Sequence, residues 1–295
     1  MTTQTTTQIS SAIFPVAGLG TRTLPVTKIT AKEMLNVVDK PVIQYAVQEA
    51  IDAGISEIVF VTAADKKSVE QHFADLPELE AQLLEKGKQD LYELIHAIVP
   101  QQVSIKAVIQ EQPLGLGHAV LCARELIGEQ PVAVILPDDL IINAGDNCLQ
   151  QMLRQYQQLQ CSVIATEEVP LQDTARYGIV EMQQGQQGYQ KMLSIVEKPT
   201  PEAAPSRHAV VGRYILSAGI WRELQQTSAG SGNEIQLTDA IAGLLQHEEI
   251  YLCDFAGRRY DCGSRLGLLQ ANVELGLTHP QLGAEFARYL AGLAK

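Results

Sequence analysis

The residues best suited to chemistry lie near the start of the chain, in a glycine-rich segment that is followed by fixed cations. A short apolar run, residues 13–17, leads into Gly18-Leu19-Gly20-Thr21-Arg22, and lysines follow at positions 28, 32 and 40. Glycine lets peptide N–H groups approach an anion closely, and arginine and lysine add positive charge. The whole chain has a net charge of −12 at pH 7, so these cations stand out in an acidic protein. The pattern predicts a loop that binds a polyphosphate.

Two other interpretations of this loop are a dinucleotide-binding turn and a simple tight turn. A dinucleotide-binding fingerprint would place a ribose-binding acid about 20 residues after its first glycine, and Asp39 lies near that position. The third glycine of the fingerprint is missing, however, because Thr23 occupies its place. A simple tight turn would leave the neighbouring cations unexplained, so phosphate binding is favoured.

A second glycine-rich segment, QEQPLGLG at residues 110–117, follows an expected strand and precedes an expected helix. A glutamine side chain offers both an acceptor and donors, which can pair with the imide edge of uracil. Glycines at positions 115 and 117 would let a base or ribose lie against the backbone. An ordinary turn with a surface glutamine is the alternative.

Acidic segments also follow expected strands. Asp138 and Asp139 come directly after VAVILP, and an acid pair at the end of a strand is a common ligand set for Mg²⁺; helix capping is the alternative. Glu197 and Lys198 could serve sugar hydroxyls and a phosphate, although the tripeptide EKP is also an ordinary surface sequence. The segment NEIQLTDAI, residues 233–241, is expected to begin a helix near Asn233 or Glu234, with either a structural or a catalytic role.

These segments together resemble the sugar-nucleotide pyrophosphorylases, and most closely the bacterial glucose-1-phosphate uridylyltransferase (UDP-glucose pyrophosphorylase) family. The likeness covers residues 12–290. It is carried, in order, by GLGTR (18–22), KEML (32–35), DKPVIQY (39–45), LGLGHAVLCA (114–123), LPDD (136–139), YGIVE (177–181), VEKP (196–199), VGRY (211–214), NEIQLTDAI (233–241) and YDCGSRLG (260–267). Alanine and asparagine stand at positions 31 and 36, where relatives often carry proline.

The resemblance implies a role for each matching residue. Catalytic roles fall on Arg22 and Lys32, which would hold the triphosphate and the leaving pyrophosphate, and on Lys198. Nucleotide binding falls on Ala17, Gly18, Leu19, Gly20, Glu33, Gln110 and Gly115. Sugar binding falls on Gly178 and Glu197, and Mg²⁺ binding falls on Asp138 and Asp261.

The implied reaction is nucleotidyl transfer from UTP to glucose 1-phosphate, giving UDP-glucose and pyrophosphate. The sugar phosphate attacks the α-phosphorus in line, assisted by Mg²⁺. With a second phosphate pKa near ~6 the nucleophile is already ionised at neutral pH, so no general base is needed. This agrees with six histidines that have no ligand spacing and no nearby nucleophile, and that are interpreted as structural or surface groups. The alternatives are a thymidylyl- or cytidylyltransferase of the same fold, a non-catalytic regulatory paralogue, and a nicotinamide-dependent dehydrogenase.

The elements that must position these residues alternate in type. Residues 13–17, 57–62, 103–109 and 132–136 are predicted as buried strands, separated by helical stretches at 41–53 and at 77–96, the latter interrupted at Gly87. This alternation, with the resemblance, predicts an α/β fold: a Rossmann-like doubly wound mixed sheet of the nucleotidyltransferase type. Shorter sugar-side strands are expected at 162–166, 178–182, 192–196 and 210–216, and helices at 263–293.

One domain is expected from residue 11 to 295, with its nucleotide side at about 11–160 and its sugar side and oligomerisation helices at about 161–295. The polar residues 1–10 are expected to form a flexible tail. Two leucine-rich stripes near the C-terminus, Leu266/Leu269/Val273/Leu277 and Leu282/Phe286/Leu290, are interpreted as core more readily than as interface. The resemblance nonetheless implies a homo-oligomer, a dimer or tetramer.

Composition excludes several classes of protein. The acidic charge argues against nucleic acid and anionic membranes as partners, and neither a membrane span nor a signal peptide is recognised. The five cysteines are widely spaced and contain no C-x-x-C pair, so neither a disulfide framework nor a zinc site is predicted. A cytoplasmic enzyme is expected.

Overall fold

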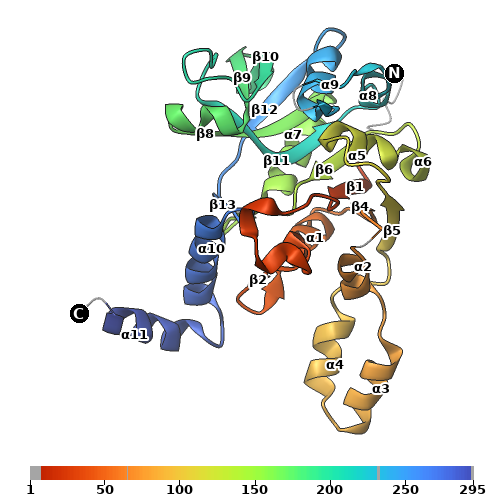
Figure 1. Ribbon diagram of the computed structural model, residues 1–295, viewed down its shortest axis with the longest axis vertical. Coiled ribbons are helices and arrows are strands. Elements are labelled where there is room, and N and C mark those ends of the chain that lie inside the picture. Colours follow the sequence, from red (N-terminus) through yellow and green to blue (C-terminus); the bar gives the residue numbers. More distant parts are fainter. Residues whose placement is uncertain (1–7, 65, 231–232, 294–295) are drawn as a thin grey trace.

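The computed structural model describes residues 8–64, 66–230 and 233–293, and one mixed sheet of nine strands forms its centre (Figure 1). The strand order is β5-β4-β1-β6-β11-β8-β12-β10-β9. Their bounds are β1 Ser11–Pro15, β4 Glu57–Thr62, β5 Ser104–Ile109, β6 Val132–Ile135, β8 Ser162–Glu168, β9 Gly178–Gln184, β10 Gln190–Glu197, β11 His208–Leu216 and β12 Ile250–Asp254. Two short ribbons pair β2 (Asn36–Val37) with β3 (Lys40–Pro41) and β7 (Asp139–Ile142) with β13 (Arg258–Asp261).

The order of the first four strands creates a crevice. The chain runs outward from β1 to β4 and β5 and then returns to the other side of β1 as β6, with β1 parallel to both β4 and β6. Ligands of doubly wound sheets bind at such a switch point, outside the carboxyl ends of the strands. The loop after β1 contains Gly18 and the turn after β6 contains Asp138. The predicted doubly wound sheet is therefore confirmed, and it brings two predicted segments to one edge.

Helices cover both faces of the sheet. Helices α1 (Val42–Asp52) and α7 (Cys148–Leu159) pack on one face, and α5 (Leu116–Cys122), α8 (Ile220–Gln226) and α9 (Leu237–Leu244) on the other. Neighbouring β1 residues divide between the two cores, since Phe14 packs with α1 and Ile13 with α5. A strand covered on both faces must be apolar at every position, which explains the continuous apolar runs. The prediction that residues 103–109 are buried is wrong: β5 is an edge strand, and Ile109 is 44% exposed.

Two pairs of helices project from this body (Figure 1). Helices α3 (Pro77–Glu85) and α4 (Gln89–His96) form a hairpin that breaks, as predicted, at Gly87, whose φ of +65° suits glycine. Helices α10 (Arg265–Thr278) and α11 (Gly283–Leu293) form the second pair. The other α-helices of the described residues are α2 (Ser68–Phe73) and α6 (Arg124–Ile127). In the part of the chain that the structure covers, no helix is both long and apolar enough to span a membrane.

The interpretation of the C-terminal stripes as core is wrong for α10. Leu266 is 66% exposed and Leu269 is 64% exposed. The helix instead turns Ala271 and Leu268 toward a small cluster that contains Tyr260. Only one face of α10 meets the body, so its leucine stripe remains uncovered. At the other end of the chain, Ile9 is already buried, and residues 1–7 of the expected tail lie outside the described residues.

One buried ion pair holds the turn after β6. Arg213 on β11 is fully buried, and its guanidinium donates three hydrogen bonds of 2.8–3.2 Å to the carboxylate of Glu49 on α1. The same guanidinium donates to the carbonyl oxygens of Leu136, at 3.0 Å, and Asp139, at 2.9 Å. These two residues bracket Asp138. The pair therefore fixes the backbone that presents this aspartate at the crevice.

Replacing Glu49 by glutamine is expected to lower the free energy of unfolding by about 3–5 kcal/mol, because it leaves a buried guanidinium without its counter-charge. Urea unfolding measures the change. Glu274→Gln is the matched control: its carboxylate lies 2.8 Å from Arg258 with both side chains exposed, and such pairs contribute about 1 kcal/mol or less. Equal effects in the two variants would contradict the role given to Glu49.

Candidate active site

The glycine loop after β1 is held in place by close packing. Gly20 has a φ of +64°, and a Cβ atom there would lie 3.2 Å from the Cβ of Lys32. The hydroxyl groups of Thr23 and Thr27 donate to the Gly20 carbonyl oxygen at 3.1 and 2.7 Å. Lys66, just beyond β4, donates from Nζ to the carbonyl oxygen of Gly18. Lys66 belongs to no motif recognised in the sequence, and the pairing of β1 with β4 brings it to the loop.

Paired charges meet at the mouth of the crevice. Lys32 Nζ lies 2.6 Å from Asp138 Oδ2, and Arg22 Nη1 lies 2.9 Å from Asp261 Oδ2. Burial opposes ionisation of Asp138, but Lys32 and then Arg22 outweigh it and hold the pKa of Asp138 below its ordinary value. Burial likewise opposes the charge on Lys32, yet Asp138 and Glu33 raise the pKa of Lys32. Both groups are therefore charged at neutral pH.

The two aspartates, 123 residues apart in the sequence, are joined by an antiparallel ribbon. Asp261 of β13 pairs with Asp139 of β7, and the N–H of Cys262 donates to the Asp138 carbonyl oxygen at 2.8 Å. A Cβ atom on Gly263 would lie 2.6 Å from Asp138 Oδ2 and 3.1 Å from Asp261 Oδ1. The two carboxylates thus converge on one small space, which only glycine leaves open.

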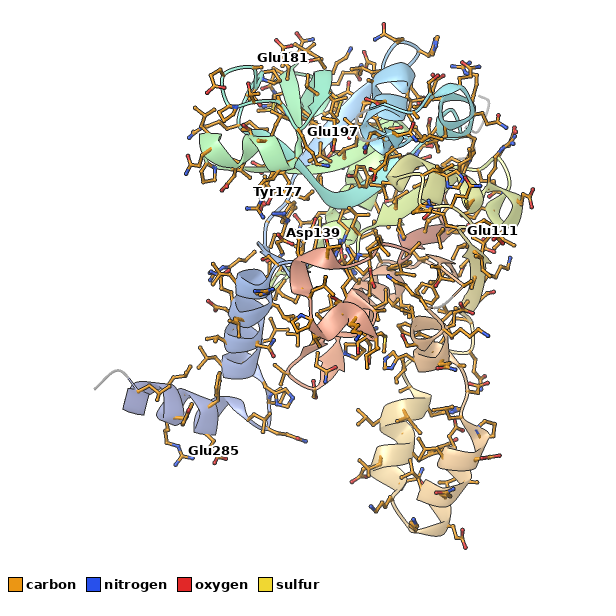
Figure 2. The ribbon with its side chains drawn as sticks, viewed as in Figure 1. Glu111, Asp139, Tyr177, Glu181, Glu197 and Glu285 are labelled. Carbon is orange, nitrogen blue, oxygen red and sulfur yellow. The ribbon has the colours of Figure 1, made fainter. Side chains whose placement is uncertain are left out.

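A cavity of about 500 Å³ opens on one side of these carboxylates and contains the residues predicted for the sugar. Thr238 donates to Glu197 Oε2 at 2.7 Å, and Lys198 Nζ lies 3.1 Å from Glu197 Oε1. A Cβ atom on Gly178 would lie 3.4 Å from both Glu197 Oε2 and Thr238 Oγ1. Figure 2 labels Glu197, Tyr177 and Asp139 in the central part of the molecule, with Tyr177 at a height between the other two, and all three line this cavity. The structure therefore brings the predicted sugar residues together beside the aspartates.

A second cavity, of about 450 Å³, lies on the other side and is lined by the predicted nucleotide residues. These are Ala17, Gly18, Leu19, Gly20, Gln110 and Gly115, and Lys32, predicted as catalytic, lines the cavity with them. Both cavities are lined by Asp138, Leu116 and Leu136, so Asp138 stands at their junction. Glu33 lines neither cavity: it is fully buried behind Lys32, and burial raises the pKa of Glu33 to about 7.

Further charged groups in the first cavity were not anticipated from the sequence. Arg176 Nη2 lies 3.1 Å from Asp261 Oδ2, so two arginines contact one carboxylate. Arg259 Nε lies 2.9 Å from Asp139 Oδ1, and its guanidinium stacks over the Tyr177 ring at 5.0 Å. Asp139 also accepts from the Gly212 N–H at 2.9 Å. Asp139 is thus tied to the scaffold, whereas Asp138 faces both cavities.

The segment 233–241 has a structural role that the sequence left open. Helix α9 begins at Leu237, three residues later than Glu234. Before it, the Ile235 N–H donates to the Leu114 carbonyl oxygen at 2.7 Å, and the Gly117 N–H donates to the Ile235 carbonyl oxygen at 2.8 Å. A Cβ atom on Gly117 would lie 2.8 Å from that oxygen, and one on Gly115 would lie 2.7 Å from the Glu234 side chain. Both positions are therefore explained by the space that this segment occupies, and not by space that a ligand would need.

Cations and converging carboxylates at the junction of two cavities define an enzyme site that joins two phosphate-bearing substrates. Residues 12–276 match the nucleotidyl transferase family. Over 292 residues the chain is 45% identical to UTP–glucose-1-phosphate uridylyltransferase of Haemophilus ducreyi, covering 96% of this chain and 98% of that protein. Over 286 residues it is 41% identical to the enzyme of that name from Bacillus subtilis, covering 97% of each. The chain therefore belongs to the nucleotidyl transferase family, in its branch of UTP–glucose-1-phosphate uridylyltransferases.

Solved structures agree. UDP-glucose pyrophosphorylase from Acinetobacter baumannii superimposes with a TM-score of 0.89 at 46% identity, covering 97% of this chain and 100% of that one. A UTP-bound structure of the Acinetobacter baumannii enzyme also gives 0.89 at 46% identity, over 96% of this chain and 99% of that one. A UDP-glucose pyrophosphorylase in complex with UDP-glucose gives 0.81 at 42% identity, over 90% of this chain and 97% of that one.

Gly263→Ala is expected to lower turnover by roughly 100-fold, because the added methyl group forces the two carboxylates and Arg22 apart and small displacements of catalytic groups have effects of that size. Steady-state kinetics measures the loss, and a thermal melt reports whether the fold persists. In Gly145→Ala the new Cβ atom would have only one neighbour within 4 Å, the Asn143 side chain at 3.8 Å, so this control should behave as wild type. Normal turnover in Gly263→Ala would show that the close approach of the Asp138 and Asp261 carboxylates at this glycine is not needed for catalysis.

Proposed function

We propose that this enzyme transfers a uridylyl group from UTP to glucose 1-phosphate, giving UDP-glucose and pyrophosphate. The observation that carries the proposal is Asp138, which lines both cavities and is neutralised by Lys32 at 2.6 Å. UTP occupies the cavity with the glycine loop, and glucose 1-phosphate occupies the cavity with Glu197. A phosphate oxygen of the sugar then meets the α-phosphorus at the junction.

The side chains position the substrates and stabilise charge. The sugar phosphate is ionised near neutral pH, and neither cavity contains a histidine among its described lining residues, so the chain needs no base. Glu197 accepts from sugar hydroxyls, and Lys198 and Arg176 attract the sugar phosphate. Arg22 and Lys32 stabilise the charge that moves onto the departing pyrophosphate.

Mg²⁺ is proposed as the cofactor, held by Asp138 and Asp261. Two observations support the fit: carboxylate oxygens suit this hard cation, and the two carboxylates converge around Gly263. In the structure Arg22 and Lys32 supply compensating positive charge to these two carboxylates. When bound, the ion would supply Lewis-acid neutralisation of phosphate charge.

A homo-oligomer, dimer or tetramer, is also proposed. Its support is the exposed stripe on α10, where Leu266 and Leu269 are more than half exposed. A cytoplasmic location is proposed on the cysteines, since all five are free in the structure and reduced thiols are typical of that compartment.

The activity is tested by measuring pyrophosphate release across UTP, dTTP, CTP and ATP, each with glucose 1-phosphate or another sugar 1-phosphate. UTP with glucose 1-phosphate should be fastest, with a kcat/KM roughly 100-fold or more above that for CTP, because a site built to pair with one base edge leaves polar groups unpaired with another. A maximum with dTTP or CTP would establish the corresponding transferase instead. No release from any pair would indicate a non-catalytic paralogue.

The shared cation is tested with Asp138→Asn, Asp261→Asn and the double variant. Each single variant should lose most of its turnover, and the double variant should lose little more, because either change disables the same ion. EDTA should abolish wild-type turnover, and Mg²⁺ should restore it. Asp146→Asn, at an exposed aspartate paired with Arg154, is the control. Losses that multiply, or full turnover in EDTA, would refute a shared metal.

A further inference from the structure

The side chain of Gln110 is oriented by two acceptors. It lines the nucleotide cavity and is only 8% exposed. Its Nε2 donates to the carbonyl oxygen of Gly115 at 3.1 Å and to Nδ1 of His118 at 3.0 Å. An amide nitrogen has two hydrogens, so both are used inside the protein.

This arrangement fixes which end of the amide faces the cavity. The Gly115 carbonyl oxygen can only accept, so the amide nitrogen of Gln110 must face it. The same nitrogen lies 3.0 Å from His118 Nδ1, which accepts in this arrangement, with the imidazole proton on His118 Nε2. Turning the amide over would place Oε1 against the Gly115 carbonyl oxygen, and His118 would have to move its proton to Nδ1 to keep a hydrogen bond to the amide. In this orientation Oε1 accepts no hydrogen bond from the described residues, and it is not fully enclosed by protein. It is therefore the atom of the Gln110 amide that remains for a ligand.

The direction of that atom matters for the base. Uracil presents an N–H donor at N3, whereas cytosine presents an acceptor there. Oε1 of Gln110 can accept from the first and repels the second. Thymine has the same imide edge as uracil, so this contact cannot separate UTP from dTTP.

Among the residues that the structure describes, His118 has no stronger partner than Gln110. It lies in the first turns of α5, and its other polar neighbour there is the sulfur of Cys122, at 3.9–4.0 Å. Burial raises the pKa of that thiol, so it stays protonated and contributes only a weak contact. The interpretation of all six histidines as structural or surface groups thus overlooked a direct partner of Gln110, which a spacing of eight residues across a turn did not reveal.

We propose that His118 is a specificity-determining residue: by accepting from Gln110 Nε2 it holds Oε1 toward the base and thereby selects uracil over cytosine. The inference rests on the proposed use of UTP. Without His118 the amide is held by one bond, to the Gly115 carbonyl oxygen, so turning it over costs that hydrogen bond but no change of histidine tautomer, and Oε1 is held less firmly toward the base.

The test compares kcat/KM for UTP, CTP and dTTP, each with glucose 1-phosphate, in wild type, His118→Ala and His118→Asn. His118→Ala should lower the UTP/CTP ratio about tenfold, the effect of one hydrogen bond, while the UTP/dTTP ratio stays within about twofold. His118→Asn places an acceptor oxygen near the former Nδ1 and should restore much of the UTP/CTP ratio. In a Gln110→Ala background, His118→Ala should change neither ratio further.

The chain offers a matched control in a second histidine–glutamine pair. His72 Nε2 lies 3.0 Å from Gln44 Oε1, and neither residue lines the two substrate cavities. His72→Ala should leave both nucleotide ratios unchanged. Variants that turn over too slowly are compared instead by thermal-shift titration with UTP and CTP.

Each outcome separates this inference from the proposed function. A wild-type enzyme without preference for UTP over CTP would overturn the proposed function. A selective wild type whose His118→Ala variant keeps the same UTP/CTP ratio would overturn the role of His118 alone. An equal fall in the UTP/CTP and UTP/dTTP ratios would also overturn it, because general damage to the cavity, and not the amide direction, would then explain the loss.

Discussion

The buried guanidinium of Arg213 is the interaction on which the active-site geometry depends. It is neutralised by Glu49 from α1 and donates to the carbonyl oxygens on both sides of Asp138. One side chain therefore links a helix, the central strand β11 and the turn after β6. A buried charge with all of its partners in place tolerates little movement, so Asp138 is held where the two cavities join.

Charge balance explains the arrangement around that turn. Asp138 and Asp261 converge, and two carboxylates at close range repel one another unless cations intervene. Lys32, Arg22 and Arg176 supply these cations from three separate segments. The same cations suit a polyphosphate, so the groups that make the site stable also make it able to bind its substrates.

The division of labour between adjacent residues follows from their partners. Asp139 is bound to Arg259 and to the backbone of Gly212, while Asp138 faces both cavities. Gln110 is restrained by Gly115 and His118 in a similar way. Asp139 is bound within the protein, which leaves Asp138 for substrate. In the same way Nε2 of Gln110 is bound within the protein, which leaves Oε1 for substrate.

The local features of the fold and of the site were predictable from the amino-acid sequence. The sequence predicted the apolar runs of β1, β4 and β6, the break at Gly87, and the glycine loop with Arg22 and Lys32. These features depend on residues that are neighbours in the sequence, through strand periodicity, glycine conformation and charge. The resemblance to the family also predicted that Asp138 and Asp261 belong to one site.

The contacts between distant segments, in contrast, follow from the three-dimensional arrangement of the strands. The pairing of β7 with β13 brings Asp261 to Asp138, and the pairing of β1 with β4 brings Lys66 to the glycine loop. The edge position of β5 and the uncovered leucines of α10 likewise depend on which neighbours an element has. These contacts depend on strand order and register over a hundred or more residues, and the spacing of residues within one segment does not predict them.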